Sequence, residues 1–289
     1  MRSIGLISNN ENSKAINVAK DVYDYLILKK VKVFLLESDE LVKKHNLPYS
    51  DEDIFKNNIE ALISVGGDGT FLRAARYAFS NNIPIMGVNV GNLGFLAEIN
   101  ISDMYDSLDK IIANNFEIEN RMLISGMLLR DKKLVDEINY PYLALNDFVI
   151  TKSLLEKIIR IKIIINGVSI VSYGGDGVII ATPTGSTAYS LSAGGPVVEP
   201  KNESIVITPI CAHTLFSRSL VISPDNQIEI QINSGKTKVD LNIDGRKRDF
   251  EVLNGDIFKV GKSNYKLNLI TFNRNIFFKI FKEKLINID

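Results

Sequence analysis

A glycine-rich stretch with a single carboxylate is the first part of the sequence that could do chemistry. Residues 64–70 read SVGGDGT, after an apolar run at 61–65 and before an amphipathic run at 71–79. This order predicts a strand, a tight turn and a helix, with backbone N–H groups and the positive end of the helix dipole directed at a phosphate. Asp68 would repel a phosphate unless it holds a metal ion, binds sugar hydroxyls or takes a proton during the reaction. The alternative is that Asp68 only caps the helix.

Composition limits the classes of partner. The 289 residues are 45 % hydrophobic and 24 % charged, which is ordinary for a globular protein of about two domains. Lys plus Arg and Asp plus Glu both number 34, so we expect small molecules or further copies of the chain as partners, with no nucleic acid and no membrane. The single cysteine, Cys211, is expected to be a buried small hydrophobe, and the absence of a signal-like segment predicts a cytoplasmic protein.

Strand-like and helix-like patterns alternate in the first part of the chain. Strand-like runs occupy 4–8, 31–36, 61–65 and 83–88, and an amphipathic helix covers about 15–27. Such alternation predicts a parallel sheet, which binds ligands at the carboxyl ends of its strands. A second glycine-rich turn, Gly91 to Gly94, follows the last of these strands and could form another wall of the same site. Phe95 either stacks on a flat ligand or belongs to the core.

From about residue 118 the pattern becomes β-rich. Strands are predicted within 122–129, 140–150, 158–165, 168–172, 178–181, 204–208, 227–232 and 238–243, mostly antiparallel. Asn166-Gly167 and Asp244-Gly245 are typical hairpin turns. Residues 275–285 form a short apolar helix. We therefore predict an α/β domain at 1–116 and 272–289, and a β-rich domain at 117–271.

The β-rich region contains a second stretch that could bind a ligand. GGDG recurs at 174–177, and residues 182–196 read TPTGSTAYSLSAGGP. Small and hydroxylated residues fill a core poorly, but they line a pocket well, because hydroxyls and bare backbone can bind ribose, phosphate and base edges. A serine-rich surface loop is the alternative interpretation.

These motifs together closely resemble the bacterial NAD kinases. The resemblance is carried by GGDGT at 66–70, NLGF at 92–95, Asn146-Asp147, GDG at 175–177 and PTGSTAYS at 183–190, and it spans roughly 4–218. The first motif is shared with diacylglycerol kinases, sphingosine kinases and phosphofructokinases. The resemblance implies a Rossmann-like α/β domain, a β-rich NAD-binding domain and a C-terminal helix that returns to the first domain. It further implies transfer of the γ-phosphoryl group of ATP to the 2′-hydroxyl of the adenosine ribose of NAD, with Mg²⁺ accompanying ATP. A homodimer or homotetramer, whose sites are completed by a neighbouring subunit, is implied as well.

The resemblance also implies roles for particular residues. Asp68 would be the general base, with Gly69 beside it and Phe95 near the dinucleotide, which Asn146 and Asp147 would fix. The other residues implied to bind the dinucleotide are Asp176, Thr187, Ala188, Tyr189, Ser190, Leu191, Ser192 and Ala212. No protein ligand for a metal is predicted.

Some positions depart from the family pattern. Gly174 stands where many relatives have arginine, and Lys157 and Arg73 are the candidates to supply the missing charge at the cofactor. Asp147 stands where many members carry glutamate, and Ala212 where proline is usual.

Two other functions remain open on the sequence. A lipid kinase of the same superfamily would require an apolar cleft or a basic membrane-facing patch, against which the balanced charge argues. A catalytically silent NAD-binding regulator would not need both aspartates of the two GDG loops.

Overall fold

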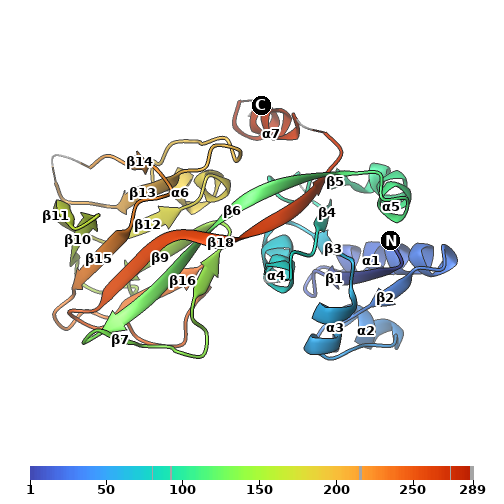
Figure 1. Cartoon of the computed structure of the whole chain (residues 1–289), viewed down its shortest axis with the longest axis horizontal. Helices are drawn as coiled ribbons and strands as arrows, with labels where there is room; N and C mark the ends of the chain where they lie inside the picture. Colours follow the sequence, from blue (N-terminus) through green and yellow to red (C-terminus); the bar gives the residue numbers. More distant parts are fainter. Residues whose placement is uncertain (80, 92, 215–216, 274, 287–289) are drawn as a thin grey trace. The chain divides into compact units, whose positions relative to one another are not determined.

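The computed structural model describes residues 1–79, 81–91, 93–214, 217–273 and 275–286 (Figure 1). The chain divides into two compact units: unit 1 is Met1–Asn120 with Tyr265–Asp289, and unit 2 is Arg121–Asn264. The division falls within two long strands, β6 (Glu117–Arg130) and β18 (Ile257–Thr271). The boundaries predicted from the sequence lie instead at the beginning of β6 and at the end of β18. Within the described ranges, no helix is long and apolar enough to cross a membrane.

Unit 1 is an α/β structure around a parallel sheet. The elements of its first part are β1 (Ser3–Ser8), α1 (Ser13–Leu28), β2 (Lys32–Phe34), α2 (Glu40–His45), α3 (Glu52–Asn58), β3 (Ala61–Gly66), α4 (Asp68–Ala78), β4 (Ile85–Asn89), β5 (Ile99–Asn100) and α5 (Met104–Ile112). The strands are ordered β2-β1-β3-β4, and β4 also pairs with β5 and with β18, all in parallel. The chain moves from β1 outward to β2 and then returns to the other side of β1 at β3. The point where strand order reverses therefore lies between β1 and β3, where sheets of this kind bind their ligands.

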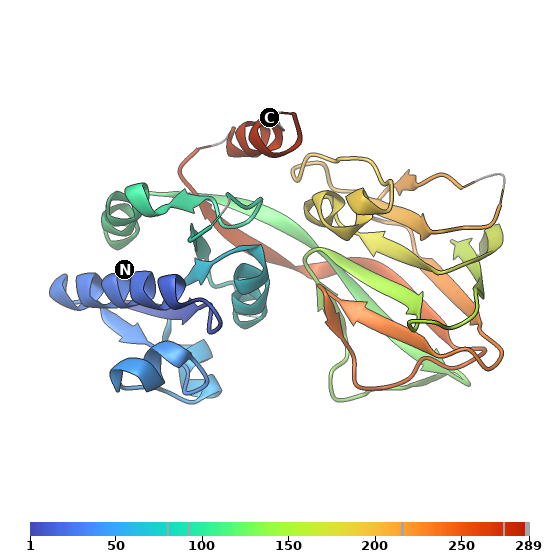
Figure 2. The same cartoon turned by 180° about the vertical axis from the view of Figure 1, so that it is seen from behind.

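Helices cover both faces of this sheet, and the strands β3 and β4 are accordingly buried at every position (Figures 1 and 2). Residues of α1 and α5 form one apolar cluster with Ile4, Leu6 and Ile63. On the other face, Gly5 lies beneath Phe55 of α3 and Gly87 beneath Phe71 of α4. The last segment, α7 (Ile276–Phe281) continued by a π-helical turn (Lys282–Ile286), also belongs to unit 1.

Unit 2 is a sandwich of antiparallel strands. Its remaining elements are β7 (Lys133–Leu134), β8 (Tyr142–Ala144), β9 (Asp147–Lys152), β10 (Ile159–Ile165), β11 (Val168–Gly175), β12 (Gly177–Ala181), α6 (Tyr189–Ser192), β13 (Ile205–Ile210), β14 (Leu220–Ile222), β15 (Ile228–Asn233), β16 (Val239–Ile243) and β17 (Arg246–Lys247). One layer is ordered β11-β10-β15-β18, and the other β14-β13-β12-β9-β16-β17 (Figure 2). Buried residues such as Ile161 and Ile230 of the first layer pack with Ile150 and Val178 of the second. The predicted fold class is thus confirmed: an α/β part with a parallel sheet, a β-rich part and a C-terminal helix.

A close approach between β4 and the following loop should be sensitive to added volume. A Cβ at Gly87 would lie 2.7 Å from the Cα of Ala97 and 2.9 Å from the Cδ2 of Phe71, so the backbone must shift to admit it. We expect Gly87→Ala to lower the free energy of unfolding by about 1–3 kcal/mol. Gly91→Ala is the matched control, because a Cβ there meets no atom within 4 Å. Denaturant titration of both variants measures the difference, and equal midpoints would show that the loop yields without cost.

Candidate active site

A cavity of about 340 Å³ lies at the turn between β3 and α4, and it is lined by Asn9, Asn10, Glu11, Gly67, Gly69, Thr70 and Arg73. The first three of these residues follow β1, and the others belong to the glycine turn and α4. The cavity therefore lies at the carboxyl ends of β1 and β3, where the strand order reverses. The guanidinium of Arg73 donates a hydrogen bond to the carbonyl oxygen of Ser8, which holds its charge at this edge of the sheet.

Gly67 and Gly69 border open space, and a methyl group at either position would not clash with the protein. A Cβ on Gly67 or Gly69 would meet no atom within 4 Å, and neither residue has a positive φ. Neither position therefore requires glycine for a left-handed backbone conformation. Helix α4 begins at Asp68, and Thr70 N and Phe71 N donate to Gly67 O, at 3.0 and 3.1 Å. The N-terminus of α4 thus faces space that a phosphate could occupy.

Asp68 is held by the second glycine-rich loop and is not a helix cap. Its Oδ2 accepts a hydrogen bond from Phe95 N at 2.9 Å, and its Oδ1 accepts from Leu96 N and Ala97 N, both at 3.1 Å. No side-chain hydrogen bond caps α4, whose N-cap residue is Gly67. A carboxylate offers about four acceptor positions, so one position on Oδ2 stays open to a hydroxyl. The helix-cap interpretation is therefore excluded by the geometry.

Gly94 is required by this arrangement. A Cβ at Gly94 would lie 1.9 Å from Oδ1 of Asp68, a distance that no side chain can occupy. The GxxG spacing of the second loop thus reflects the approach of the Asp68 carboxylate to the backbone. Asn92, the first residue of the NLGF motif, lies outside the described residues.

Phe95 is half-buried against the C-terminal helix. Its ring centroid lies 6.0 Å from that of Phe277 in α7, and the Lys284 ammonium lies 5.3 Å from the Phe95 centroid. Phe277 of the last segment therefore packs against the same loop whose backbone N–H groups bind the Asp68 carboxylate.

In unit 2, Asn146 and Asp147 are fixed by Asp244. Oδ1 of Asp244 accepts hydrogen bonds from Asn146 N at 2.7 Å and Asp147 N at 3.2 Å, and Oδ2 accepts from Leu145 N at 3.0 Å. Sequence reasoning assigned Asp244 only to a hairpin turn and missed this role. The turn itself is confirmed, with φ of 48° at Asp244 and 74° at Gly245 between β16 and β17.

The hydroxyl-rich stretch at 182–196 begins in contact with Asn146. Thr182 N donates to Asn146 O at 2.8 Å, and a Cβ on Gly185 would lie 2.0 Å from that same oxygen. Glycine is therefore necessary at 185 for the chain to pass this closely. The structure thus brings the stretch at 182–187 to Asn146-Asp147, although the two lie far apart in the sequence.

Asp147 carries an unusual charge state. Burial, and next the negative charge of Asp244, raise the pKa of Asp147 to about 7. The Asp147 side chain is 4 % exposed, and no described residue donates a hydrogen bond to its carboxyl group. It can therefore exchange a proton near neutral pH.

Tyr189, Asp176 and Cys211 lie near one another and near Asp147. Burial, followed by the charges of Cys211, Asp176 and Asp147, raises the pKa of the Tyr189 phenol. The Nζ of Lys152 lies 3.7 Å from Oδ1 of Asp176, an ion pair that sequence reasoning did not name. Cys211 is exposed with φ of 46°, so the prediction that it is buried is wrong: the residue lies in a tight turn after β13.

The other predicted residues of unit 2 occupy different environments. Gly174 pairs with Arg160 across β10 and β11, and Lys157 is exposed in the loop before β10. The Ser190 hydroxyl is buried 2.9 Å from that of Thr208. Tyr189 and Ser192 are exposed, whereas Thr187, Ala188, Leu191 and Ala212 are partly buried. Asp68, Gly69, Arg73 and Phe95 belong to unit 1 and the remaining predicted residues to unit 2.

Comparison with known proteins defines the class. The ATP-NAD kinase N-terminal domain matches residues 4–116, and the ATP-NAD kinase C-terminal domain matches 145–272. The chain therefore belongs to the NAD kinase family, as its motifs predicted.

Individual relatives are similar over nearly the whole chain. An NAD kinase of Caldanaerobacter subterraneus is 39 % identical over 292 residues, covering 99 % of both chains. An NAD kinase of Moorella thermoacetica is 35 % identical, covering 99 % of this chain and 89 % of its own. Among solved structures, an NAD kinase from Archaeoglobus fulgidus in complex with ATP has a TM-score of 0.75 at 25 % identity, covering 98 % of both chains. Yeast NADH kinase complexed with NADH has a TM-score of 0.90 at 23 % identity, covering 100 % of this chain and 89 % of its own, and it shares the fold.

The raised pKa of Asp147 predicts a pH dependence of stability. The folded chain holds this proton up to about pH 7, whereas the unfolded chain releases it near pH 3.9, so stability falls as the pH rises between these values. Asp147→Asn cannot ionise, so we expect its melting temperature to vary less from pH 4.5 to 8 and to exceed that of the wild type at pH 8. Exposed Asp225→Asn is the control. Parallel pH profiles for the wild type and Asp147→Asn would show that Asp147 is ionised in the folded chain.

Proposed function

We propose that the chain transfers the γ-phosphoryl group of ATP to the 2′-hydroxyl of the adenosine ribose of NAD, giving NADP and ADP. The observation that carries the proposal is the Asp68 carboxylate, which three backbone N–H groups fix and which keeps one acceptor position open. A carboxylate in this state can take the proton of the attacking hydroxyl as the new oxygen–phosphorus bond forms and ADP leaves. Membership of the NAD kinase family supports this reaction over a lipid kinase or a silent NAD-binding regulator.

The phosphates of ATP would occupy the cavity at the N-terminus of α4. Gly67 and Gly69 leave room for them, and Arg73 adds a positive charge at this edge of the sheet. The A. fulgidus relative was solved with ATP bound, which is consistent with this assignment.

The dinucleotide would be bound by Asn146, Asp147, Asp176 and Tyr189, with Phe95 near it. The residues proposed to complete its surroundings are Gly69, Lys157, Gly174, Thr187, Ala188, Ser190, Leu191, Ser192 and Ala212. The raised pKa of Tyr189 supports part of this set: burial is its main cause, but the charges of Cys211, Asp176 and Asp147 also contribute, so these groups lie within electrostatic range of the phenol.

Mg²⁺ would accompany ATP. No group of three His, Cys, Asp or Glu residues in the described ranges could hold a metal ion by itself, whereas Mg²⁺ typically binds substrate phosphates with few protein ligands. Glu11 offers carboxylate oxygens beside the cavity, which suits a hard cation of this kind. When bound, the ion would spread the charge of the transferring phosphoryl group.

A homodimer or homotetramer in the cytoplasm completes the proposal. Strand β11 ends its layer, with Val168 61 % and Ile170 47 % exposed. An open strand edge with exposed apolar residues suits contact with another copy of the chain.

The reaction can be tested directly. We expect purified protein to form NADP from NAD, ATP and Mg²⁺ in a coupled spectrophotometric assay. Parallel incubations with diacylglycerol and with sphingosine, followed by detection of phosphorylated lipid, test the rival reaction. Lipid phosphorylation without NADP would reject the proposal, and binding of NAD with no product in any incubation would favour the silent regulator.

The role of Asp68 can be tested by Asp68→Asn. Asparagine cannot take a proton at neutral pH, so we expect kcat to fall about 10²–10⁴-fold. One amide orientation or the other places an NH₂ group against a backbone N–H, so the free energy of unfolding should also fall by about 1–3 kcal/mol.

Asp256→Asn separates the two effects. Asp256 likewise accepts a backbone N–H, from Leu253 at 2.8 Å, and pairs with Arg130, but it is not among the proposed site residues. We expect comparable destabilisation with kcat retained, measured below the melting temperature of both variants. Wild-type kcat in Asp68→Asn would remove Asp68 from the chemistry.

A further inference from the structure

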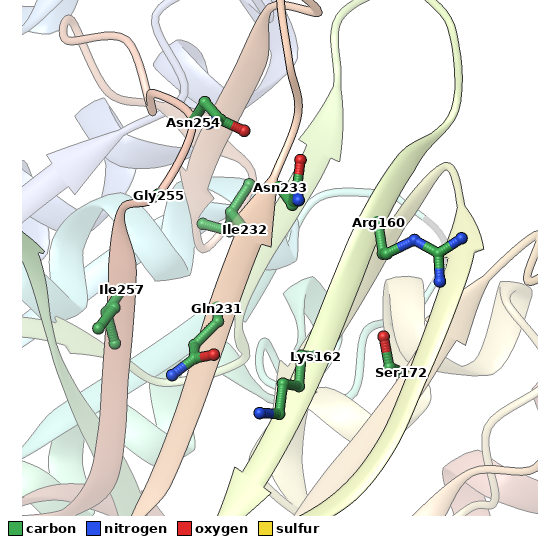
Figure 3. A pocket seen from close by; sticks show the side chains of 9 residues that line it. All are labelled: Arg160, Lys162, Ser172, Gln231, Ile232, Asn233, Asn254, Gly255 and Ile257. Carbon is green, nitrogen blue, oxygen red and sulfur yellow. The ribbon is translucent and has the colours of Figure 1, made fainter.

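A second cavity lies within unit 2, on the outer face of the layer β11-β10-β15-β18. It has a volume of about 420 Å³, and its polar lining consists of Arg160, Lys162, Ser172, Gln231, Asn233 and Asn254 (Figure 3). The register of the strands explains the grouping: Lys162 pairs with Ser172 and Gln231, and Arg160 pairs with Asn233. Paired residues of neighbouring strands project from the same face of a sheet.

The cavity lies on the other side of the unit 2 core from Asp147, although Gly174, another residue proposed to bind the dinucleotide, pairs with Arg160 at its border. Successive residues of a strand point to opposite faces, so Ile159, Ile161 and Ile163 of β10 are buried in the sandwich core while Arg160 and Lys162 point away from it. Asp147 belongs to β9, in the other layer. The apolar core of unit 2 therefore lies between Asp147 and this cavity.

The polar groups of the cavity lack partners in the protein. The side chains of Arg160, Lys162, Ser172, Gln231 and Asn233 form no hydrogen bond or ion pair with another residue in the described ranges. The Asn254 Oδ1 accepts from Ser234 N and Gly235 N, both at 3.0 Å, which leaves its NH₂ group as a fixed donor.

The electrostatics of this face favour an anion. No described Asp or Glu lines the cavity. The nearby carboxylate of Glu229 is neutralised by Lys259 at 2.8 Å, and that of Asp256 by Arg130 at 2.9 Å. Two positive charges therefore remain without a counter-charge, and the neutral groups around them can donate hydrogen bonds.

We propose that this cavity binds a short phosphate chain, such as a triphosphate group. Arg160 and Lys162 are two residues apart on β10, which separates their backbone positions by about 7 Å. One ligand with several charged groups can therefore bind both. The Arg160 guanidinium would bind one phosphate through its two-pronged geometry, and the Lys162 ammonium would bind another as a point charge. Ser172, Gln231 and Asn254 would donate to the remaining oxygens.

The test is titration calorimetry of the full chain with sodium tripolyphosphate at about 0.15 M NaCl, where long-range attraction is largely screened. The variant R160Q/K162Q removes both cations. K132Q/K133Q is the matched control, because it removes two exposed lysines from the β6–β7 turn in the same unit. Neither double substitution touches the cavity at the N-terminus of α4 in unit 1, so tripolyphosphate bound there contributes equally to all three titrations, and the difference between variants isolates the cavity in unit 2.

We expect the wild type and K132Q/K133Q to share one site per chain that R160Q/K162Q binds about 10–100-fold more weakly. Melting temperatures of the three proteins verify that each is folded. Identical isotherms for the wild type and R160Q/K162Q would overturn the proposal. Citrate is titrated in parallel, and tighter binding of citrate than of tripolyphosphate at this site would overturn the assignment to phosphate.

Discussion

The contact between the Asp68 carboxylate and the backbone N–H groups of residues 95–97 is the constraint on which the rest of unit 1 depends. It connects the turn after β3, which lines the cavity at the N-terminus of α4, to the loop after β4, so the ends of these two strands cannot move independently. Hydrogen bonds to a charged group contribute roughly 1.5–3 kcal/mol each, and they add to the apolar packing of Val90, Leu96 and Ala97, which are buried in this loop. The same carboxylate is the candidate base, so its position for chemistry is determined by the fold.

Unit 2 contains the same kind of contact between a carboxylate and three backbone N–H groups. Asp244 accepts from three consecutive N–H groups, at residues 145–147, as Asp68 does at residues 95–97. Successive N–H groups that converge in this way form a concave site for an anion. In unit 1 the Asp68 carboxylate keeps one acceptor position for a ligand. In unit 2 the Asp244 carboxylate lies near a second buried carboxyl group, and the cost of two negative charges close together is reduced because Asp147 keeps its proton up to about pH 7.

Sequence periodicity predicted the fold class well, because the pattern of apolar residues follows which side chains are buried. The strand at 61–65 is buried throughout and lies in the centre of the parallel sheet, and the Asn166-Gly167 and Asp244-Gly245 turns have the backbone angles that these residues favour. The motifs predicted the family for a different reason: their glycines are required where two backbone segments approach each other closely, as Gly185 approaches Asn146.

What the sequence could not predict were contacts between distant segments. Nothing in the spacing of residues indicates that Asp68 reaches the backbone 27 residues later, or that Asp244 reaches back 98 residues to Asn146. Cys211 was assigned to the core from its residue type, but its left-handed φ belongs to a turn that brings it to the surface. The sequence did not indicate a binding role for Arg160 and Lys162, because alternating charged and apolar residues are ordinary for a strand with one exposed face.

Gly67 and Gly69 have a consequence for how changes in this chain would be detected. Most glycines in tight places, such as Gly94 and Gly185, cannot be replaced without disturbing their neighbours. Gly67 and Gly69 face open space, so a methyl group there would leave the protein intact while filling the position proposed for a phosphate. Expression level, solubility and thermal stability would all report a healthy protein, and only a measurement of ligand binding or turnover would reveal the defect.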